Sequence, residues 1–101
     1  MRSWKYAHLY TSAGIRLHSS DPLLIDWGLA QLRNQDPSGR ANAFELHTGQ
    51  KYEFVWYPKD VKVSYLALWL LSQLLLLGWE PFQVEDEIGE YGWFLRRMDD
   101  Q

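Results

Sequence analysis

An alternation of aromatic and polar residues near the start of the chain predicts its first strand. The alternation runs from Trp4 to Thr11, and a period of two among β-forming residues is typical of a strand. Alternate positions would share one face of that strand: Trp4, Tyr6, His8 and Tyr10. A turn signal at residues 12–14 then favours a short second strand over Ile15 to His18.

Helical spacing replaces this alternation after Ser20. Asp21 followed by Pro22 provides an N-cap residue and the residue preferred at the first helical position. The apolar positions that follow predict a helix that ends at about Asn34. Gly28 lies inside this helix and costs about 1 kcal/mol relative to alanine, unless a close contact requires it.

Turn residues and short apolar runs predict four more strands and one more helix. A loop at 36–40 precedes strands over 43–47 and 51–57, which residues 48–50 would join as a hairpin. Two further strands over 79–85 and 91–98 follow the second helix. We therefore expect an α+β domain over residues 1–101, with a mainly antiparallel sheet and two helices packed on one face, in the order β(β)αββαββ.

The second helix is apolar almost throughout. It would begin at Asp60 or Ser64 and run to Leu77, where Gly78 suits the position just after a helix. Only Ser72 and Gln73 interrupt the apolar run from residue 65 to 77. This run is shorter than the roughly 20 residues that cross a bilayer, so we expect no membrane span.

A helix that is apolar all round must be covered all round. One stripe would face the sheet: Leu66, Leu70, Gln73, Leu74 and Leu77. The opposite side leaves two interpretations open. Either the first helix and the N-terminal strand cover it, or it forms an interface with a second copy of the chain or another protein through Leu68, Trp69, Ser72 and Leu75.

Aromatic content and charge bear on the choice of partner. Six Trp, six Tyr and four Phe are more than a core of this size comfortably hides, so some would face a partner. The net charge of −3 argues against nucleic acid, which requires a basic face. The chain has no cysteine and its first residues lack the apolar segment of a signal peptide, so we expect a cytoplasmic protein.

No motif for catalysis, metal binding or a cofactor is present in the sequence. The acidic residues Glu85, Asp86, Glu87 and Glu90 lack the spacing of a calcium loop and are interpreted as a solvated turn, balanced across the strands by Arg96 and Arg97. The histidines at 8, 18 and 47 lie far apart, without the local spacing of a metal site. We predict no catalytic residue, no metal ligand and no cofactor.

The strand over 51–57 offers an alternative function. Tyr52, Phe54 and Trp56 would share one face of it. Such a row is typical of core packing, or of a platform on which a small aromatic ligand or a nucleotide stacks. Our main expectation is an interaction module that associates with itself, and ligand binding by this strand is the alternative.

The second half of the chain resembles a small bacterial α+β domain family of unknown function. The matching stretches are Tyr52 to Tyr57, Leu76-Leu77-Gly78-Trp79-Glu80, and Trp93-Phe94-Leu95-Arg96-Arg97. They correspond to an aromatic strand, a helix that ends in Leu-Gly, a Gly-Trp-Glu opening of a hairpin, and a final strand with paired basic residues. The resemblance covers roughly half of the chain. It implies a fold and no mechanism.

Overall fold

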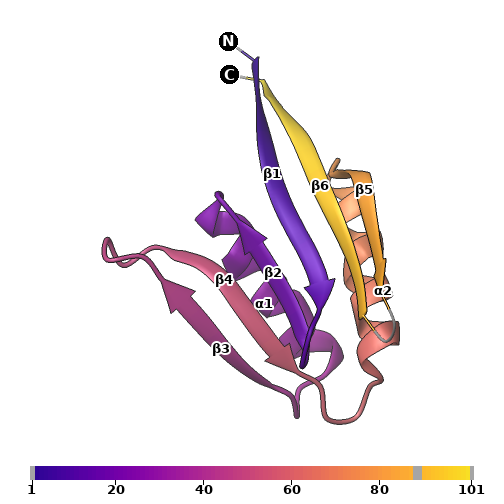
Figure 1. Ribbon diagram of the computed structural model, residues 1–101. Coiled ribbons are helices and arrows are strands. Elements are labelled where there is room, and N and C mark those ends of the chain that lie inside the picture. Colours follow the sequence, from indigo (N-terminus) through magenta and orange to yellow (C-terminus); the bar gives the residue numbers. More distant parts are fainter. Residues whose placement is uncertain (1, 88–89, 101) are drawn as a thin grey trace.

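The chain folds as one six-stranded antiparallel sheet with two helices. The computed structural model describes residues 2–87 and 90–100. Its elements in chain order are β1 (Arg2–Thr11), β2 (Ile15–Ser19), α1 (Pro22–Gln35), β3 (Arg40–Glu45), β4 (Lys51–Tyr57), α2 (Val63–Leu76), β5 (Glu80–Glu87) and β6 (Glu90–Asp100) (Figure 1). The predicted α+β class and element order are confirmed.

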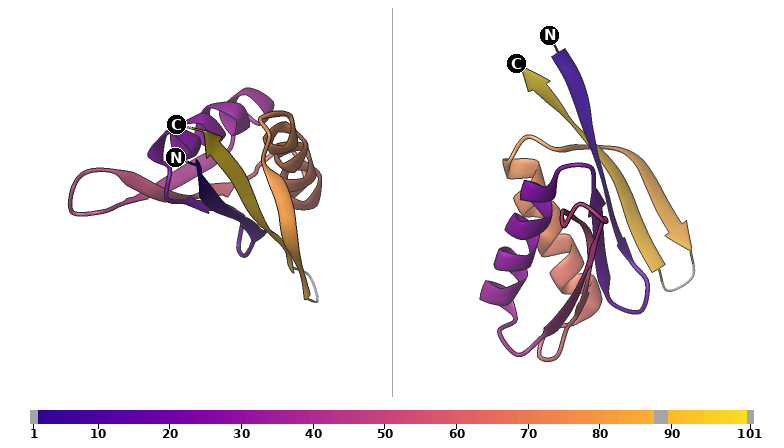
Figure 2. Two further views of the ribbon diagram at one scale, coloured as in Figure 1. Left: turned by 90° about the horizontal axis from the view of Figure 1, so that it is seen from above. Right: turned by 90° about the vertical axis from the view of Figure 1, so that its left-hand side faces the viewer.

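The strands lie in the order β3-β4-β2-β1-β6-β5, and each neighbouring pair is antiparallel. Both helices lie on the same side of this sheet, α1 mainly over β4 and β2, and α2 over β1 (Figure 2). Within residues 2–87 and 90–100, no helix lies on the other side (Figures 1 and 2). The strand β1 lies near the middle of the sheet, so its side chains decide the character of both faces.

The core fills the space between the sheet and the helices. Residues that are paired across the sheet point into it together, such as Leu9 with Leu17, and Leu17 with Phe54. The helix α2 contributes Leu66, Leu70 and Leu74 from one stripe, as its spacing predicted. Gly28 of α1 packs directly against this layer: a Cβ there would lie 2.9 Å from Phe54 Cε2. A close contact with the core therefore explains why this helix has a glycine in its interior.

The helix ends follow the local sequence in part. Asp21 caps α1 by accepting a hydrogen bond from the backbone N–H of Leu23 at 3.1 Å. The end of α2 has Gly78 at φ +92°, and Trp79 N–H donates to the Leu74 carbonyl, as in a Schellman motif. The start of α2 differs from our prediction, because Lys62 is its N-cap residue and no side chain caps it.

The buried side chain of Asp36 binds the segment that precedes α2. The Asp36 carboxylate accepts hydrogen bonds from Trp56 Nε1 at 3.1 Å and from the backbone N–H groups of Lys59 and Asp60. The N–H of Asp60 is thus bound to the end of α1, and Asp60 does not begin the second helix. Asp36 ties three parts of the chain together in the interior.

Several strand boundaries also differ from the sequence prediction, among them those of β3 and of the last strand. The strand β3 covers Arg40–Glu45 instead of 43–47, because the Leu46 N–H and the Gln50 carbonyl bond to each other and close the hairpin there. The last strand extends to Asp100, since β1 pairs with it along nearly its whole length, from Arg2↔Asp100 to Tyr10↔Gly92. Long-range pairing lengthens strands beyond their local signals.

Candidate functional site

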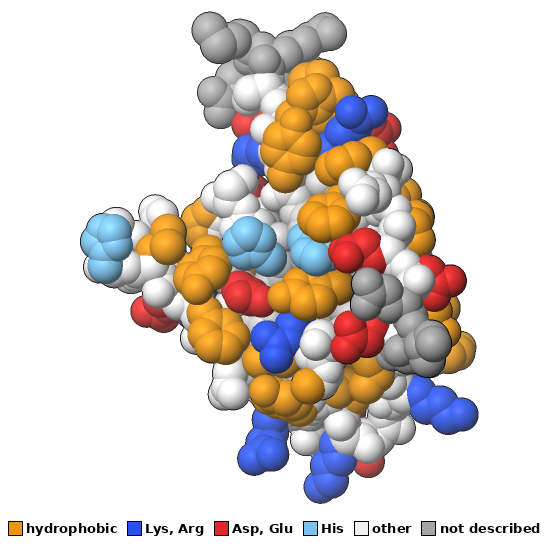
Figure 3. Space-filling model, in the orientation of Figure 1, with side chains coloured by type: hydrophobic (Ala, Val, Ile, Leu, Met, Phe, Trp, Pro, Cys, Tyr) orange, Lys and Arg blue, Asp and Glu red, His pale blue; other side chains and the backbone are white. Residues whose placement is uncertain are grey.

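The helix-free side of the sheet presents aromatic and charged residues from five strands. The predicted face of β1 points to this side, because its four residues are exposed or half-buried whereas Ala7 and Leu9 between them are buried. We call this surface the open face and define it by Trp4, Tyr6, His8, Tyr10, Arg16, His18, Glu53, Phe82, Glu85, Phe94 and Arg96. Figure 3 looks onto it and shows two histidines at its centre, with hydrophobic and acidic side chains around them.

His8 is the centre of a stack of three rings. Its imidazole lies parallel to the Phe94 ring of β6, with ring centres 4.0 Å apart. It also stacks on the Tyr10 ring of its own strand, at 4.2 Å. Its Nε2–H donates to Glu85 Oε1 of β5 at 2.7 Å, because a carboxylate can only accept. These contacts fix the ring orientation and leave His8 half-buried.

Gly92 makes room for the bond between His8 and Glu85. The strands β1 and β5 are not neighbours, since β6 lies between them. Gly92 of β6 pairs with Tyr10 on one side and Glu85 on the other. A Cβ at this glycine would lie 3.1 Å from Tyr10 Cβ and 3.2 Å from Glu85 Oε1. The missing side chain thus lets the Glu85 carboxylate reach over β6 to His8.

A second carboxylate reaches the middle of the open face from the other side. Tyr10 donates its phenolic hydrogen to Glu53 Oε1 of β4 at 3.0 Å, across the intervening strand β2. Arg16 Nη1 lies 4.0 Å from the same carboxylate oxygen. Burial, and then the hydrogen bond and charge of Glu53, raise the pKa of the Tyr10 phenol above its usual value. Tyr10 therefore stays protonated and serves as a donor.

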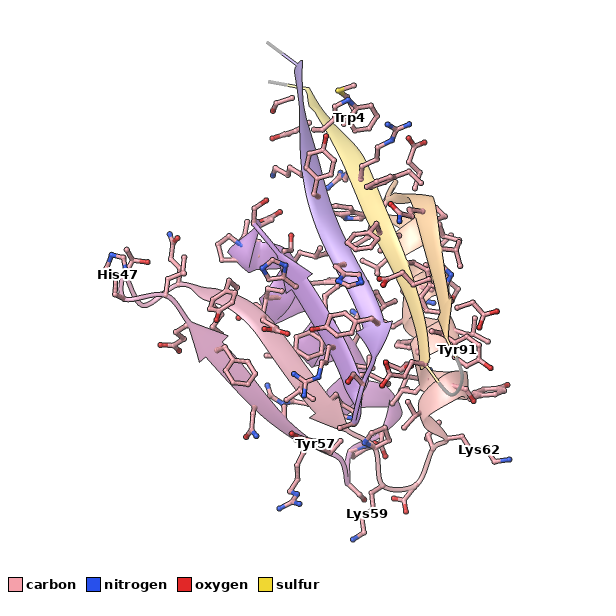
Figure 4. The ribbon with its side chains drawn as sticks, viewed as in Figure 1. Trp4, His47, Tyr57, Lys59, Lys62 and Tyr91 are labelled. Carbon is pink, nitrogen blue, oxygen red and sulfur yellow. The ribbon has the colours of Figure 1, made fainter. Side chains whose placement is uncertain are left out.

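Arg96 forms the upper part of the open face. Its Nε donates to Glu80 Oε1 at 2.7 Å. Its guanidinium carbon also lies 4.4 Å from the ring centre of Trp4 and 5.6 Å from that of Phe82. Trp4 marks this end of the face in Figure 4. The positive charge of Arg96 is thus matched within the chain.

Two cavities hollow the open face on either side of the ring stack, and His8 lines both. One, of about 320 Å³, is bordered by Tyr10, Glu85, Glu90 and Tyr91. The other, of about 270 Å³, is bordered mainly by rings: Tyr6, His18, Phe82 and Phe94. Their sizes are close to those of small-molecule sites.

Two of the three residues that the sequence proposed as a ligand platform on β4 do not reach the open face. Phe54 and Trp56 are 0% and 1% exposed and pack in the core beneath α1. Only Tyr52 reaches the open face, where its ring makes an edge contact with His18 at 5.7 Å. The irregular register between β3 and β4 at this point separates Tyr52 from the face of its neighbours. The row of three aromatics is thus not accessible to a ligand.

The residues proposed as an interface lie on the side of α2 away from the sheet. Leu68 and Leu75 are 56% and 45% exposed, and Ser72 between them is exposed as well. Trp69 lies at the edge of this side and packs partly against the core. We define the outer face of α2 by Tyr65, Leu68, Ser72, Leu75 and Leu76, all of them exposed. Of the two interpretations left open by the sequence, cover by α1 and β1 is therefore wrong.

A groove continues the outer face of α2 onto the sheet. It has a volume of about 240 Å³ and is lined by Ser64, Ala67 and Leu68 of α2 with Tyr91 and Trp93 of β6. Val84 of the edge strand β5 pairs with Trp93 and is itself exposed. Apolar side chains from three elements thus form one surface.

The acidic residues after Glu80 are engaged differently from our prediction. Arg96 pairs with Glu80, which is not among the four acidic residues predicted to balance it. Glu85 bonds His8 on the open face, and the turn at 88–89 lies outside the described residues. His47 is at the tip of the β3–β4 hairpin (Figure 4), whereas His8 and His18 pair in register on β1 and β2. Within residues 2–87 and 90–100, no three His, Asp or Glu side chains converge as metal ligands.

Comparisons with known proteins add no relative. No protein-family model, curated protein or solved structure matches the chain. The resemblance of the second half to a small bacterial domain family stays a prediction. In the described part of the chain, neither helix combines the length and the apolarity that crossing a membrane requires.

Proposed function

We propose that this protein is an interaction module that associates with a second copy of itself through the outer face of α2. The observation that carries the proposal is that leucines of an uncharged helix lie exposed, and no part of the chain that the structure describes covers them. A surface of this kind on a small domain marks a contact site, because water disfavours a continuous apolar patch.

A second copy suits this surface because the helix carries no charge. No Asp, Glu, Lys or Arg occurs from Val63 to Trp79. Two such helices meet across a two-fold axis without burying a charge and without repulsion between like charges. Ser64 and Ser72 are small, so they allow two helices to approach closely between the leucines.

The groove beside Leu68 enlarges the contact. A helix of this length extends for only about 21 Å, and a stable interface needs roughly 800 Å² from each partner. The outer face of α2 therefore acts together with Tyr91 and Trp93 at the groove and with Val84 on β5. Leucines of the second copy would fill the groove.

The free edge of β5 is a poor alternative route to a dimer. This strand carries Glu80, Glu85 and Asp86. Antiparallel pairing of two copies of β5 would bring these carboxylates close together, and like charges on an edge strand oppose such pairing. Association through α2 avoids this repulsion.

Sedimentation equilibrium between about 10 and 500 μM tests the proposal, a range that suits an interface of modest area. We expect a reversible dimer for the natural chain. The double variant Leu68→Glu/Leu75→Glu should remain folded, because both side chains are half exposed, and should be a monomer. Leu23→Glu is the matched control: it changes an exposed leucine of α1 in the same way and should leave the dimer intact.

A monomer at every concentration would overturn the proposal. It would equally fail if Leu23→Glu weakened association as much as the double variant. The proposal also places the protein in the cytoplasm, on the grounds of its lack of cysteine. Cell fractionation with an antibody to the untagged chain tests that location.

A further inference from the structure

We propose that the open face binds a small aromatic amine, a molecule that joins a flat apolar ring to a protonated amino group. The two cavities beside His8 carry the inference. One of them is walled by rings and the other by rings and carboxylates, and they adjoin at a single residue. This binding site is separate from the self-association proposed above.

The ring-walled cavity suits the flat part of such a ligand. Tyr6 and Phe82 meet edge to face with ring centres 6.1 Å apart, and Phe82 lies 6.3 Å from Phe94. These side chains come from β1, β5 and β6, and the rest of the lining is Ala7, His8, His18, Ser19 and Ser20. An aromatic ring placed there would exchange water for packing and for ring contacts. The two histidines provide polar edges at its border.

The neighbouring cavity suits the amino group. Glu85 and Glu90 both line it, and neither forms an ion pair with Lys or Arg among the residues that the structure describes. His8 occupies one oxygen of Glu85 and leaves the other for a ligand. The Tyr10 ring borders the same space. Carboxylates combined with aromatic rings stabilise an organic ammonium group.

The charges of the open face disfavour a phosphate in the same place. Its two arginines are already matched, Arg16 with Glu53 and Arg96 with Glu80. A nucleotide would bring its negative charge toward Glu85 and Glu90. The nucleotide that the sequence suggested as a ligand is therefore the less suitable one, and a cation the more suitable.

A series of three ligands with the same ring and different charge tests the inference. Phenethylamine is positive, 2-phenylethanol is neutral and phenylacetate is negative at pH 7, and all three carry the same ring. Titration calorimetry, with NMR detection of the His8 and His18 ring protons, should show binding of phenethylamine about tenfold tighter than 2-phenylethanol, with phenylacetate weakest. Equal binding of the three ligands, or no binding of phenethylamine, would overturn the proposal.

Two substitutions in neighbouring positions test whether Glu85 causes the preference for the positively charged ligand. Glu85→Gln should remove the preference for phenethylamine over 2-phenylethanol. Asp86→Asn makes the same change one residue later in β5, where the side chain points to the other face of the sheet, and should preserve the preference. Equal effects of the two substitutions would contradict a specific site. Phe82→Ala should weaken all three ligands alike, since it removes an exposed ring that lines the apolar cavity.

We expect binding of phenethylamine to the open face to be independent of the oligomeric state. Leu68 and Leu75 line neither cavity of the open face. The monomeric variant Leu68→Glu/Leu75→Glu should therefore bind phenethylamine as the natural chain does. Loss of binding in this variant would contradict a site on the open face alone.

Discussion

His8 and Glu85 form a hydrogen bond of 2.7 Å across a strand that belongs to neither of them. The bond connects the central strand β1 to the edge strand β5 over β6. It depends on a glycine, because a side chain at position 92 would crowd the Glu85 oxygen that accepts this bond. The hydrogen bond between His8 and Glu85 is thus possible because position 92 has no side chain.

Gly92→Ala should break this contact. The added methyl group would lie 3.2 Å from Glu85 Oε1 and 3.1 Å from Tyr10 Cβ, closer than ordinary packing allows. We expect a loss of about 1 kcal/mol in the free energy of unfolding and a changed NMR shift of the His8 ring. Urea denaturation measures the first effect.

A double-mutant cycle identifies the cause of that loss. In the background of Glu85→Ala, the substitution Gly92→Ala should cost clearly less, because the displaced carboxylate is gone. A cost that is unchanged in this background would show that Glu85 is not the group that Gly92 accommodates.

Asp36→Ala should be among the most damaging polar substitutions. It removes the acceptor of three hydrogen bonds in the interior and leaves Trp56 Nε1 and two backbone N–H groups without their partner. We expect a loss of about 3 kcal/mol in the free energy of unfolding, measured by urea denaturation. The control Asp26→Asn affects an exposed ion pair with Lys51 and should cost less than about 0.5 kcal/mol. Similar losses for the two variants would contradict the role of Asp36.

Gly28→Ala should not stabilise the protein although alanine is the better helix former. The helix would gain about 1 kcal/mol from its backbone. The new methyl group would lie 2.9 Å from Phe54 Cε2 and 3.0 Å from Leu17 Cδ2, both in the close-packed core. Overpacking costs about 1 to 3 kcal/mol, so we expect a net loss or no gain in the thermal midpoint.

The exposed position Ala30 in the same helix gives the reverse control. Ala30→Gly meets no packing constraint and should lose about 1 kcal/mol through propensity alone. A raised thermal midpoint for Gly28→Ala would refute close packing at that site.

Tyr10 should make the stability depend on alkaline pH. Its pKa is raised in the folded protein by burial and then by Glu53, so the folded state binds the phenolic proton more firmly than the unfolded state does. This contribution to stability is complete below the unfolded value of about 10 and is lost as the pH rises through the raised folded pKa. Urea denaturation at several pH values should show a flatter alkaline decline for Tyr10→Phe than for the natural chain. Tyr65→Phe, at an exposed position on α2, serves as the control and should keep the natural slope.

The fold follows from local sequence to a large extent. Alternation in β1, the Asp21-Pro22 entry to α1 and the Gly78 exit from α2 are properties of a few adjacent residues, because they depend on backbone geometry and short-range hydrogen bonds. These signals were sufficient to predict the class, the order of elements and the shared face of Trp4, Tyr6, His8 and Tyr10. They placed strand ends less well, since pairing with a distant strand sets those ends.

The candidate site was decided by the tertiary structure. The aromatic rows of β1 and β4 look alike in sequence, yet α1 buries Phe54 and Trp56 and no helix covers Tyr6, His8 and Tyr10. His8 and Glu85 are 77 positions apart, and nothing in their local sequences indicates that they meet. The sequence by itself determined which side chains share a face, because that depends on backbone periodicity. Only the packing of helices on the sheet decided which face stays open, because that depends on contacts between segments far apart in the chain.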